Sequence, residues 1–274
     1  MGVLKDLTKE YFGEKIRKED EINIDGLEVK IVPFKDNNGK YHKRGYKPKD
    51  LDNLKDLLKR MIEVRGDEGD FNDIDTSEIK SMELLFAINN TFNGNISGWD
   101  VSKVKNMSGM FSSATAFNQD ISNWDVLKVE NMSGMFGWAT SFNQPIGDWE
   151  FPKVEDMTGM FCGAKSFNQD ISKWKFPNVK KMESMFQDAT SFNQPIGDWK
   201  FPNVKTMESM FKGATSFNQP IGDWEFPVVT NMSTMFESAT SFNQDISSWN
   251  VNGVDVSDMF TKCPIKGKHK PKME

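Results

Sequence analysis

The chain of 274 residues contains few of the side chains on which catalytic and metal sites depend. It has two histidines and two cysteines, and His42 and His269 lie near opposite ends of the sequence. No glycine-rich phosphate loop, metal-spaced Cys/His set or nucleophile motif is present. We therefore predict a protein that is not an enzyme and that uses no metal and no cofactor.

Long hydrophobic runs are also missing. No stretch of about 18 apolar residues occurs, which argues against a transmembrane helix. Charged residues interrupt the apolar positions at the N-terminus, where neither a signal peptide nor a lipobox is present. The expected location is the cytoplasm, or the cell surface or exterior if an export signal has been removed.

Arginine is absent from residues 71–261, which contain 13 lysines and 23 acidic residues and so carry a net charge of −10. Because such a surface repels phosphates, nucleic acid is not the expected partner. A protein partner is expected instead, although the sequence names neither that partner nor an oligomeric state.

Tryptophan is the residue that organises the sequence. It recurs at an interval of 25 residues, at Trp99, Trp124, Trp149, Trp174, Trp199, Trp224 and Trp249. Valine, methionine, phenylalanine, alanine and an F-N-Q triplet follow each of them at fixed distances. Self-similarity of this period predicts a solenoid of stacked units.

Proline limits where a parallel strand can run, because it cannot donate a hydrogen bond to the next turn. It occurs at only two repeat positions, which flank a six-residue segment of the form L-x-x-L-x-L. This form is typical of leucine-rich-repeat strands. We predict strands at 96–101, 121–126 and so on to 246–251, with a degenerate first copy at 71–76.

The rest of each unit keeps apolar residues three and four positions apart, as in Val104, Met107, Met110, Phe111 and Ala114. Such spacing predicts a helical or 3-10 segment on the opposite wall. The expected fold is an α/β, leucine-rich-repeat-like solenoid of about eight 25-residue units over residues 71–262, with the tryptophans and methionines in its core.

Two further columns carry structural expectations. The asparagine column either forms an internal ladder that binds backbone groups or lies in a solvated turn; it comprises Asn93, Asn118, Asn143, Asn168, Asn193, Asn218 and Asn243. Cys162 and Cys263 are about four units apart, or ~19 Å at the strand spacing. An internal disulfide needs Cα atoms within about 7 Å and is excluded.

Both ends of the chain depart from the repeat. Residues 22–34, a turn signal at 36–39 and a return strand from Tyr41 predict a β-hairpin. Leucines from Leu51 onward predict an amphipathic helix closed by Gly66, so that residues 1–70 form an α+β cap. Residues 263–274 are basic, and we expect a disordered tail, with an arm for nucleic acid or an acidic partner as the alternative.

The unit W-D-V-S-K-V-K-N-M-S-G-M-F-S-S-A-T-A-F-N-Q-D-I-S-N resembles the repeat of the BspA-like leucine-rich-repeat surface proteins, also called the DUF285 or 26-residue lipoprotein repeat. The resemblance covers residues 71–262, and the segment from Tyr46 to Ile79 is similar to the lead-in of family members. It implies a bacterial or phage origin and a non-enzymatic role in adhesion or protein binding.

The residues on either side of each repeating tryptophan are predicted to point away from the core, and they vary while the frame does not. The binding candidates after tryptophan are Asp125, Glu150, Lys175, Lys200 and Glu225, and those before it are Asp148, Lys173, Asp198 and Asp223. A merely solvated charged face is the alternative.

Trp138 is the tenth binding candidate, because it occupies a column that elsewhere holds small or polar residues. An exposed tryptophan is a common hot-spot residue, although this one could instead cover a neighbouring turn. We therefore expect a protein-binding solenoid that uses its strand face. The alternative is an intracellular inhibitor or effector acting on a host or defence protein, whose N-terminal region carries the activity.

Overall fold

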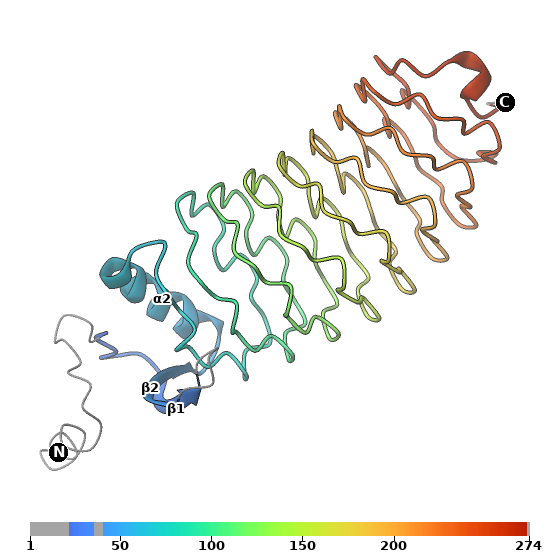
Figure 1. Ribbon diagram of the computed structural model, residues 1–274. Coiled ribbons are helices and arrows are strands. Elements are labelled where there is room, and N and C mark those ends of the chain that lie inside the picture. The colour runs from blue at the N-terminus through green and yellow to red at the C-terminus, as the bar shows by residue number, and fades with distance from the viewer. Residues whose placement is uncertain (1–21, 36–40, 273–274) are drawn as a thin grey trace, which may run out of the picture.

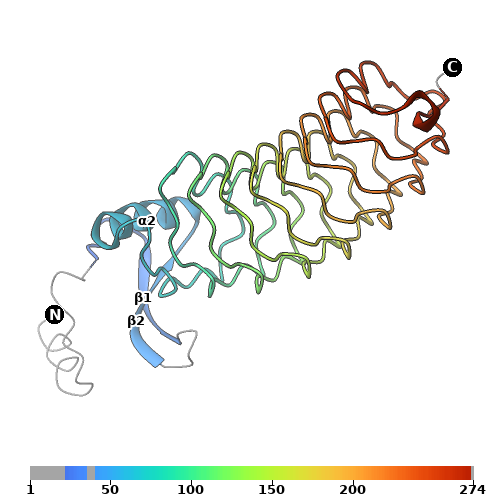
Figure 2. The same cartoon turned by 45° about the horizontal axis from the view of Figure 1, so that its top comes forward.

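The computed structural model describes residues 22–35 and 41–272 of the chain. Two strands, β1 (Val29–Lys35) and β2 (Tyr41–Pro48), are followed by the helix α2 (Leu51–Arg65). A long stack of similar turns comes next, and the short 3-10 helix η2 (Gly267–His269) lies at its far end (Figure 1). The N-terminal elements therefore close one end of the stack, as a view from another side also shows (Figure 2).

The predicted hairpin is confirmed, with a later start. β1 and β2 pair antiparallel from Val29 opposite Pro48 to Lys35 opposite Tyr41, with an irregularity between Val32 and Phe34. The first strand begins at Val29 and not at residue 22, and the turn predicted at 36–39 lies outside the described residues.

The predicted helix is also confirmed, and its two ends are capped. The Asp50 side chain accepts a hydrogen bond from the backbone N–H of Asn53. Gly66 ends the helix with a φ of 78°, a backbone conformation that residues with a side chain disfavour. The buried face consists of Leu54, Leu57, Leu58 and Met61. This face belongs to the same hydrophobic core as the stack, so α2 covers the apolar end that a solenoid must protect.

Backbone hydrogen bonds join the cap to the first turn. Tyr46 of β2 donates to Asp73 O and accepts from Asp75 N, both at 2.8 Å. Arg65 of α2 adds two bonds of 2.7 Å to the Asp73 carboxylate. Burial alone would lower the pKa of Arg65, but this pairing with Asp73 outweighs it and the pKa is raised. The guanidinium is therefore a fixed charge at the joint.

Successive turns of the stack are held by backbone hydrogen bonds on one wall. The N–H groups of Met107, Gly109 and Phe111 donate to carbonyls of the following turn at 2.8–2.9 Å. One parallel bridge per turn continues this contact through the chain, joining Ser81, Asn106, Asn131, Asp156, Lys181, Thr206, Asn231 and Asp255. We call this wall, residues 106–114 and their equivalents, the ladder wall.

The strands predicted around the repeating tryptophans are wrong. Residues 96–104 and their equivalents, here called the tryptophan wall, form two tight turns in which Trp99 N bonds to Ile96 O and Val104 N to Val101 O. The apolar L-x-x-L-x-L spacing arises because a β-turn brings its first and fourth residues close together on one side.

The predicted helical segments are wrong for the same reason. On the ladder wall, Met110 N bonds to Met107 O and Ala114 N to Phe111 O, so two β-turns replace a helix. Gly109 and Ser113, the third residues of these turns, have φ values of 59° and 60°. The described part of the stack therefore consists of turns and isolated bridges, and its classification as a leucine-rich-repeat solenoid stays a prediction.

The repeating aromatic and methionine side chains form the core, as expected. Phe111 and Phe136 stack with ring centroids 5.6 Å apart, and the same contact recurs along the stack. Trp174 and Trp199 stack at 6.4 Å. The buried indole of Trp174 also donates to Ile146 O at 3.1 Å, so its polar group is satisfied.

The asparagine ladder is confirmed in its bonding but lies at the surface rather than inside. Asn118 Oδ1 accepts the backbone N–H of Asn143 at 2.9 Å, and its backbone O accepts Gln144 Nε2 at the same distance. This pattern continues to Lys266, whose N–H binds Asn243 Oδ1. Both Asn118 and Asn143 are half-buried.

The disordered tail predicted for residues 263–274 is wrong for the part that the structure describes. Ile265 is buried, and Ile246 N donates to His269 O at 3.0 Å. His269 Nδ1 lies 3.0 Å from Asn243 O, and Lys270 lies over the Phe260 ring. Residues 263–272 therefore cap the last turn.

Replacing Asn118 by Ala should destabilise the stack by about 1–3 kcal/mol, because it leaves the half-buried N–H of Asn143 without its acceptor. Urea unfolding followed by circular dichroism measures the loss. Asn123 is exposed and serves as the matched control. Its replacement by Ala should cost under about 0.5 kcal/mol. Equal losses for the two variants would show that the ladder contributes nothing specific.

Candidate functional site

The predicted binding residues around the tryptophans are all exposed and form two rows along the tryptophan wall. The rows are Asp125, Glu150, Lys175, Lys200 and Glu225, and Asp148, Lys173, Asp198 and Asp223. Residues 25 apart in a row are neighbours, since Lys173 Nζ lies 2.8 Å from Asp148 Oδ1. The structure thus brings these side chains together on one surface, although on turns and not on strands.

The row that follows the tryptophans is divided by charge sign. Asp125 and Glu150 precede Lys175 and Lys200, and Glu225 follows. The stacked rings of Trp174 and Trp199 fix the two lysines in adjacent turns, and neither lysine forms an ion pair with a described residue. Like charges placed side by side are destabilising, so this arrangement does not arise from the stability of the fold.

Other positions of the stack show the opposite arrangement. Ion pairs between residues 25 apart join Glu78 to Lys103, Lys105 to Glu130, Asp148 to Lys173, Glu155 to Lys180, Asp156 to Lys181 and Lys212 to Glu237. The turn-to-turn spacing therefore suits opposite charges, whereas Lys175 and Lys200 form no ion pair with a described residue.

Trp138 lies on the ladder wall, away from these rows. Its neighbour Phe136 meets Trp149 of the tryptophan wall inside the core, with ring centroids 6.5 Å apart. The Trp138 N–H donates to Cys162 O at 2.6 Å as part of the ladder. The structure therefore separates Trp138 from the other nine candidates by the thickness of the core.

Trp138 has an unusual backbone and a partly exposed side chain. Its φ is 59°, in the left-handed region that disfavours bulky residues, and 46% of the residue is exposed. A Cβ built on Gly163 of the next turn would meet three atoms of the indole at 2.5–3.0 Å. The ring thus covers Gly163, as the alternative interpretation of this tryptophan proposed, and also remains accessible.

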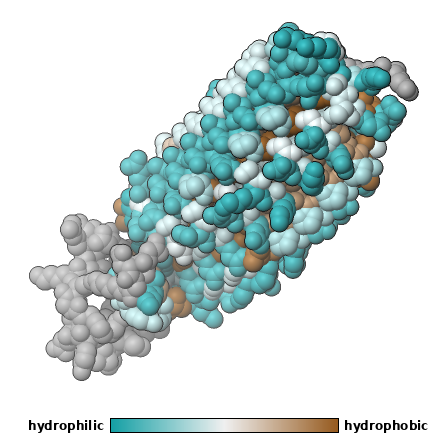
Figure 3. All heavy atoms as spheres, turned by 45° about the vertical axis from the view of Figure 1, so that its right-hand side comes forward, coloured by the Kyte–Doolittle hydropathy of each residue, from teal (hydrophilic) through white to brown (hydrophobic). Residues whose placement is uncertain are grey.

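Two further apolar residues of the ladder wall are exposed and were not found from the sequence. Leu84 is 53% and Ile88 77% exposed, and their φ values are 53° and 65°. They occupy the columns of Gly109 and Ser113 in the first copy of the repeat. This copy is degenerate, so an unusual residue type there does not stand out in the sequence. A space-filling view of one side of the stack shows a mostly hydrophilic face with small apolar patches (Figure 3).

Cys162, beside Trp138, is not an activated nucleophile. Burial and the nearby Asp188 raise the pKa of its thiol to about 11. At neutral pH the thiol is therefore protonated and weakly reactive. Both cysteines are free, and no group of three His, Cys, Asp or Glu in the described ranges could hold a metal ion.

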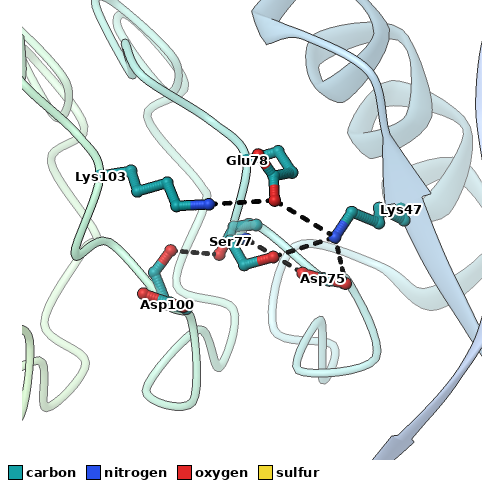
Figure 4. A network of polar contacts seen from close by, with 7 residues as sticks. Lys47, Asp75, Ser77, Glu78, Asp100 and Lys103 are labelled. Carbon is teal, nitrogen blue, oxygen red and sulfur yellow. Dashed lines mark hydrogen bonds and ion pairs between the residues drawn. The ribbon is translucent and has the colours of Figure 1, made fainter.

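A polar network lies where the cap meets the first two turns (Figure 4). Lys47 of β2 contacts Ser77 Oγ at 3.1 Å and Asp75 at 3.0 Å, and Glu78 contacts Lys103 at 3.0 Å. Burial alone would raise the pKa of Asp75, but the hydrogen bonds from Ser77 and Lys47 outweigh it and the pKa is lowered. A groove of about 930 Å³ between β1, β2, the start of α2 and residues 78–81 adjoins this network.

Comparison of sequences identifies the family of the repeat. A family model described as "Mycoplasma protein of unknown function, DUF285" matches residues 53–174 and 163–269. The chain belongs to the DUF285 family. The resemblance seen in the repeat unit is thereby confirmed.

No curated protein and no solved structure matches this DUF285 chain. In the described part of the chain, no helix has the length and hydropathy needed to cross a membrane.

Replacing Gly163 by Ala should displace the Trp138 indole, because the new Cβ would occupy the position of the ring. The other seven tryptophans are buried, so the fraction of fluorescence quenched by acrylamide reports on Trp138 and should rise. Gly213→Ala is the matched control, since Gly213 has nearly the same φ, 67° against 68°, and no tryptophan above it. An equal change in quenching for both variants would contradict the predicted contact.

Proposed function

We propose that this DUF285 protein is a non-enzymatic scaffold that binds a protein partner through its tryptophan wall, and that it comes from a bacterium or a phage. Family membership supports a repeat protein of the BspA-like type. The observation that carries the choice of wall is the division of the row after the tryptophans into an acidic and a basic block.

The stack is suited to such a role because its core and its surface are separate. The tryptophan, phenylalanine and methionine columns hold the turns at a constant spacing, while the outward rows lie in solvent. Apart from Asp125, which accepts the N–H of Leu127, and the Asp148–Lys173 ion pair, side chains in these rows can vary in charge with little effect on the fold. A row with blocks of opposite sign selects a partner with the complementary order of charges and repels one with the reverse order.

Lys175 and Lys200 are the residues that we expect to contribute most to the specificity of this contact. They are exposed, adjacent and unpaired, whereas Lys173 beside them is neutralised by Asp148. The expected partner therefore presents carboxylates opposite the turns that contain Trp174 and Trp199. Exposed charges of this kind act mainly on the rate of association and on specificity.

Charge reversal at both lysines tests the proposal. The full-length protein is immobilised, and the proteins that it captures from an extract of the source cell are quantified by mass spectrometry. Lys175→Glu combined with Lys200→Glu should reduce capture of the specific partner by about tenfold, because two attractive contacts become repulsive, about 1.4 kcal/mol in total. Because Glu at 175 and 200 would lie next to Glu150 and Glu225, the melting temperature is measured as well, and capture is compared at a temperature at which both proteins are folded.

The control carries the same change of net charge elsewhere. Lys165→Glu combined with Lys262→Glu alters two exposed lysines that lie outside the tryptophan wall. This variant should capture the partner as the wild type does. Equal loss with both double variants would indicate a nonspecific effect of net charge, and unchanged capture with the first would remove this row from the binding site.

A further inference from the structure

The ladder wall contains a feature that neither the fold nor the proposed function requires. Position 138 needs a φ near 60°, which glycine, serine or aspartate adopts at the equivalent positions 163, 213, 238 and 188. A tryptophan there strains the backbone, and such strain persists where function selects it. The side chain lies outside the core and packs against Gly163 of the next turn, so core packing does not account for its retention.

The orientation of the indole is unusual as well. The atoms that a Cβ on Gly163 would meet are Cδ2, Cε3 and Cε2, which lie at the middle of the fused rings. The glycine therefore contacts a face of the ring and not its edge. Gly163 is buried, whereas Gly213 in the same column is only half-buried. The indole thus lies over Gly163 with one face against the wall, and the exposed part of the residue is directed to solvent.

The ladder-wall segments of the Trp138 turn and of the turn before it are uncharged. Segments 106–115 and 131–140 contain no Asp, Glu, Lys or Arg, although such residues make up 27% of the chain. The equivalent segment 156–165 has Asp156 and Lys165 at its two ends, and 181–190 contains three charged residues. In the preceding turn, the N–H of Ser113 donates to Gly137 O at 2.7 Å, so the two turns are in register.

Hydrogen-bonding groups replace charges on this surface. The hydroxyls of Ser112, Ser113 and Ser133 and the amide nitrogen of Asn131 make no hydrogen bond with another described residue. The thiol of Cys162 is protonated at neutral pH and adds no charge. The ladder wall thus carries a flat aromatic face together with neutral donors and acceptors.

We propose that this surface binds a neutral oligosaccharide, with one sugar ring stacked on the free face of Trp138. The apolar C–H face of a pyranose suits the indole, and the sugar hydroxyls suit the serine hydroxyls and the Asn131 amide. Segments 106–115 and 131–140 offer an anionic ligand no counter-charge. A protein partner would be expected to use Ile88 and Leu84 as well, and these lie two turns away, beyond Ser113 and Gly109.

To test this, the full-length protein is titrated separately with cellohexaose, maltohexaose and hexa-N-acetylchitohexaose, and binding is followed by calorimetry and by intrinsic fluorescence. At least one of these oligosaccharides should bind and should reduce acrylamide quenching, because Trp138 is the exposed tryptophan. Trp138→Ala should weaken that binding by about tenfold or more, as expected for loss of an aromatic stacking contact. Trp138→Phe should retain more of the affinity than Trp138→Ala.

Two controls separate this site from the others. Ile88→Ser and the Lys175→Glu, Lys200→Glu double variant should both bind the oligosaccharide as the wild type does, so failure of the proposed protein contact leaves this result unaffected. The proposal is overturned if none of the three oligosaccharides binds or if Trp138→Ala binds them unchanged. Loss of sugar binding in Ile88→Ser also overturns it, since that result indicates the broader apolar contact expected for protein docking.

Discussion

The hydrogen bonds between successive turns of the ladder wall are the interaction on which the rest of this structure depends. Alternate N–H groups, such as those of Gly109 and Phe111, donate to the next turn, while those of Met110 and Ser112 close β-turns within their own. Every second donor therefore fixes the stacking and the others fix the shape of the turn. Since buried backbone donors must be paired, a change of length within the ladder segment would leave some of them unsatisfied. A residue lost outside it does not, because Met232 and Thr234 keep their bonds to Asp255 and Ser257 across a unit of 24 residues.

This alternation also determines what the surface can carry. A β-turn with a positive φ at its third residue places that residue outside the core, at positions such as Gly109, Ser113 and Gly163. Small residues occupy most of these sites because the left-handed region disfavours large ones. A large residue there is under strain and in contact with solvent, so Leu84, Ile88 and Trp138 stand out more clearly than exposed apolar residues on a helix would.

Much of the fold follows from the sequence, but the location of the ladder does not. The 25-residue period, the buried tryptophan and phenylalanine columns, the hairpin, the helix and the asparagine bonding are all predicted from residue patterns. The strands were assigned to the wrong wall because a spacing of three residues fits β-turns, helices and the L-x-x-L-x-L pattern alike. The position of proline did not separate the two walls, since proline is also absent from the ladder segments 104–117 and their equivalents up to 229–242. The ordered C-terminal residues were missed because the acceptors that hold them, Asn243 Oδ1 and O, depend on the stack.

The candidate surfaces differ in how far the sequence reveals them. Exposure of the residues flanking each tryptophan follows from the repeat itself, because these positions vary while the frame is constant. Trp138 is found in the same way, as a departure from its column. The orientation of its indole is not predictable from the sequence, because the ring can lie flat only where Gly163 has a positive φ and no Cβ. The two surfaces lie on opposite sides of a core that is the same in every unit, so outward side chains on one wall do not contact those on the other. A DUF285 stack can therefore acquire a charged contact and an uncharged one independently.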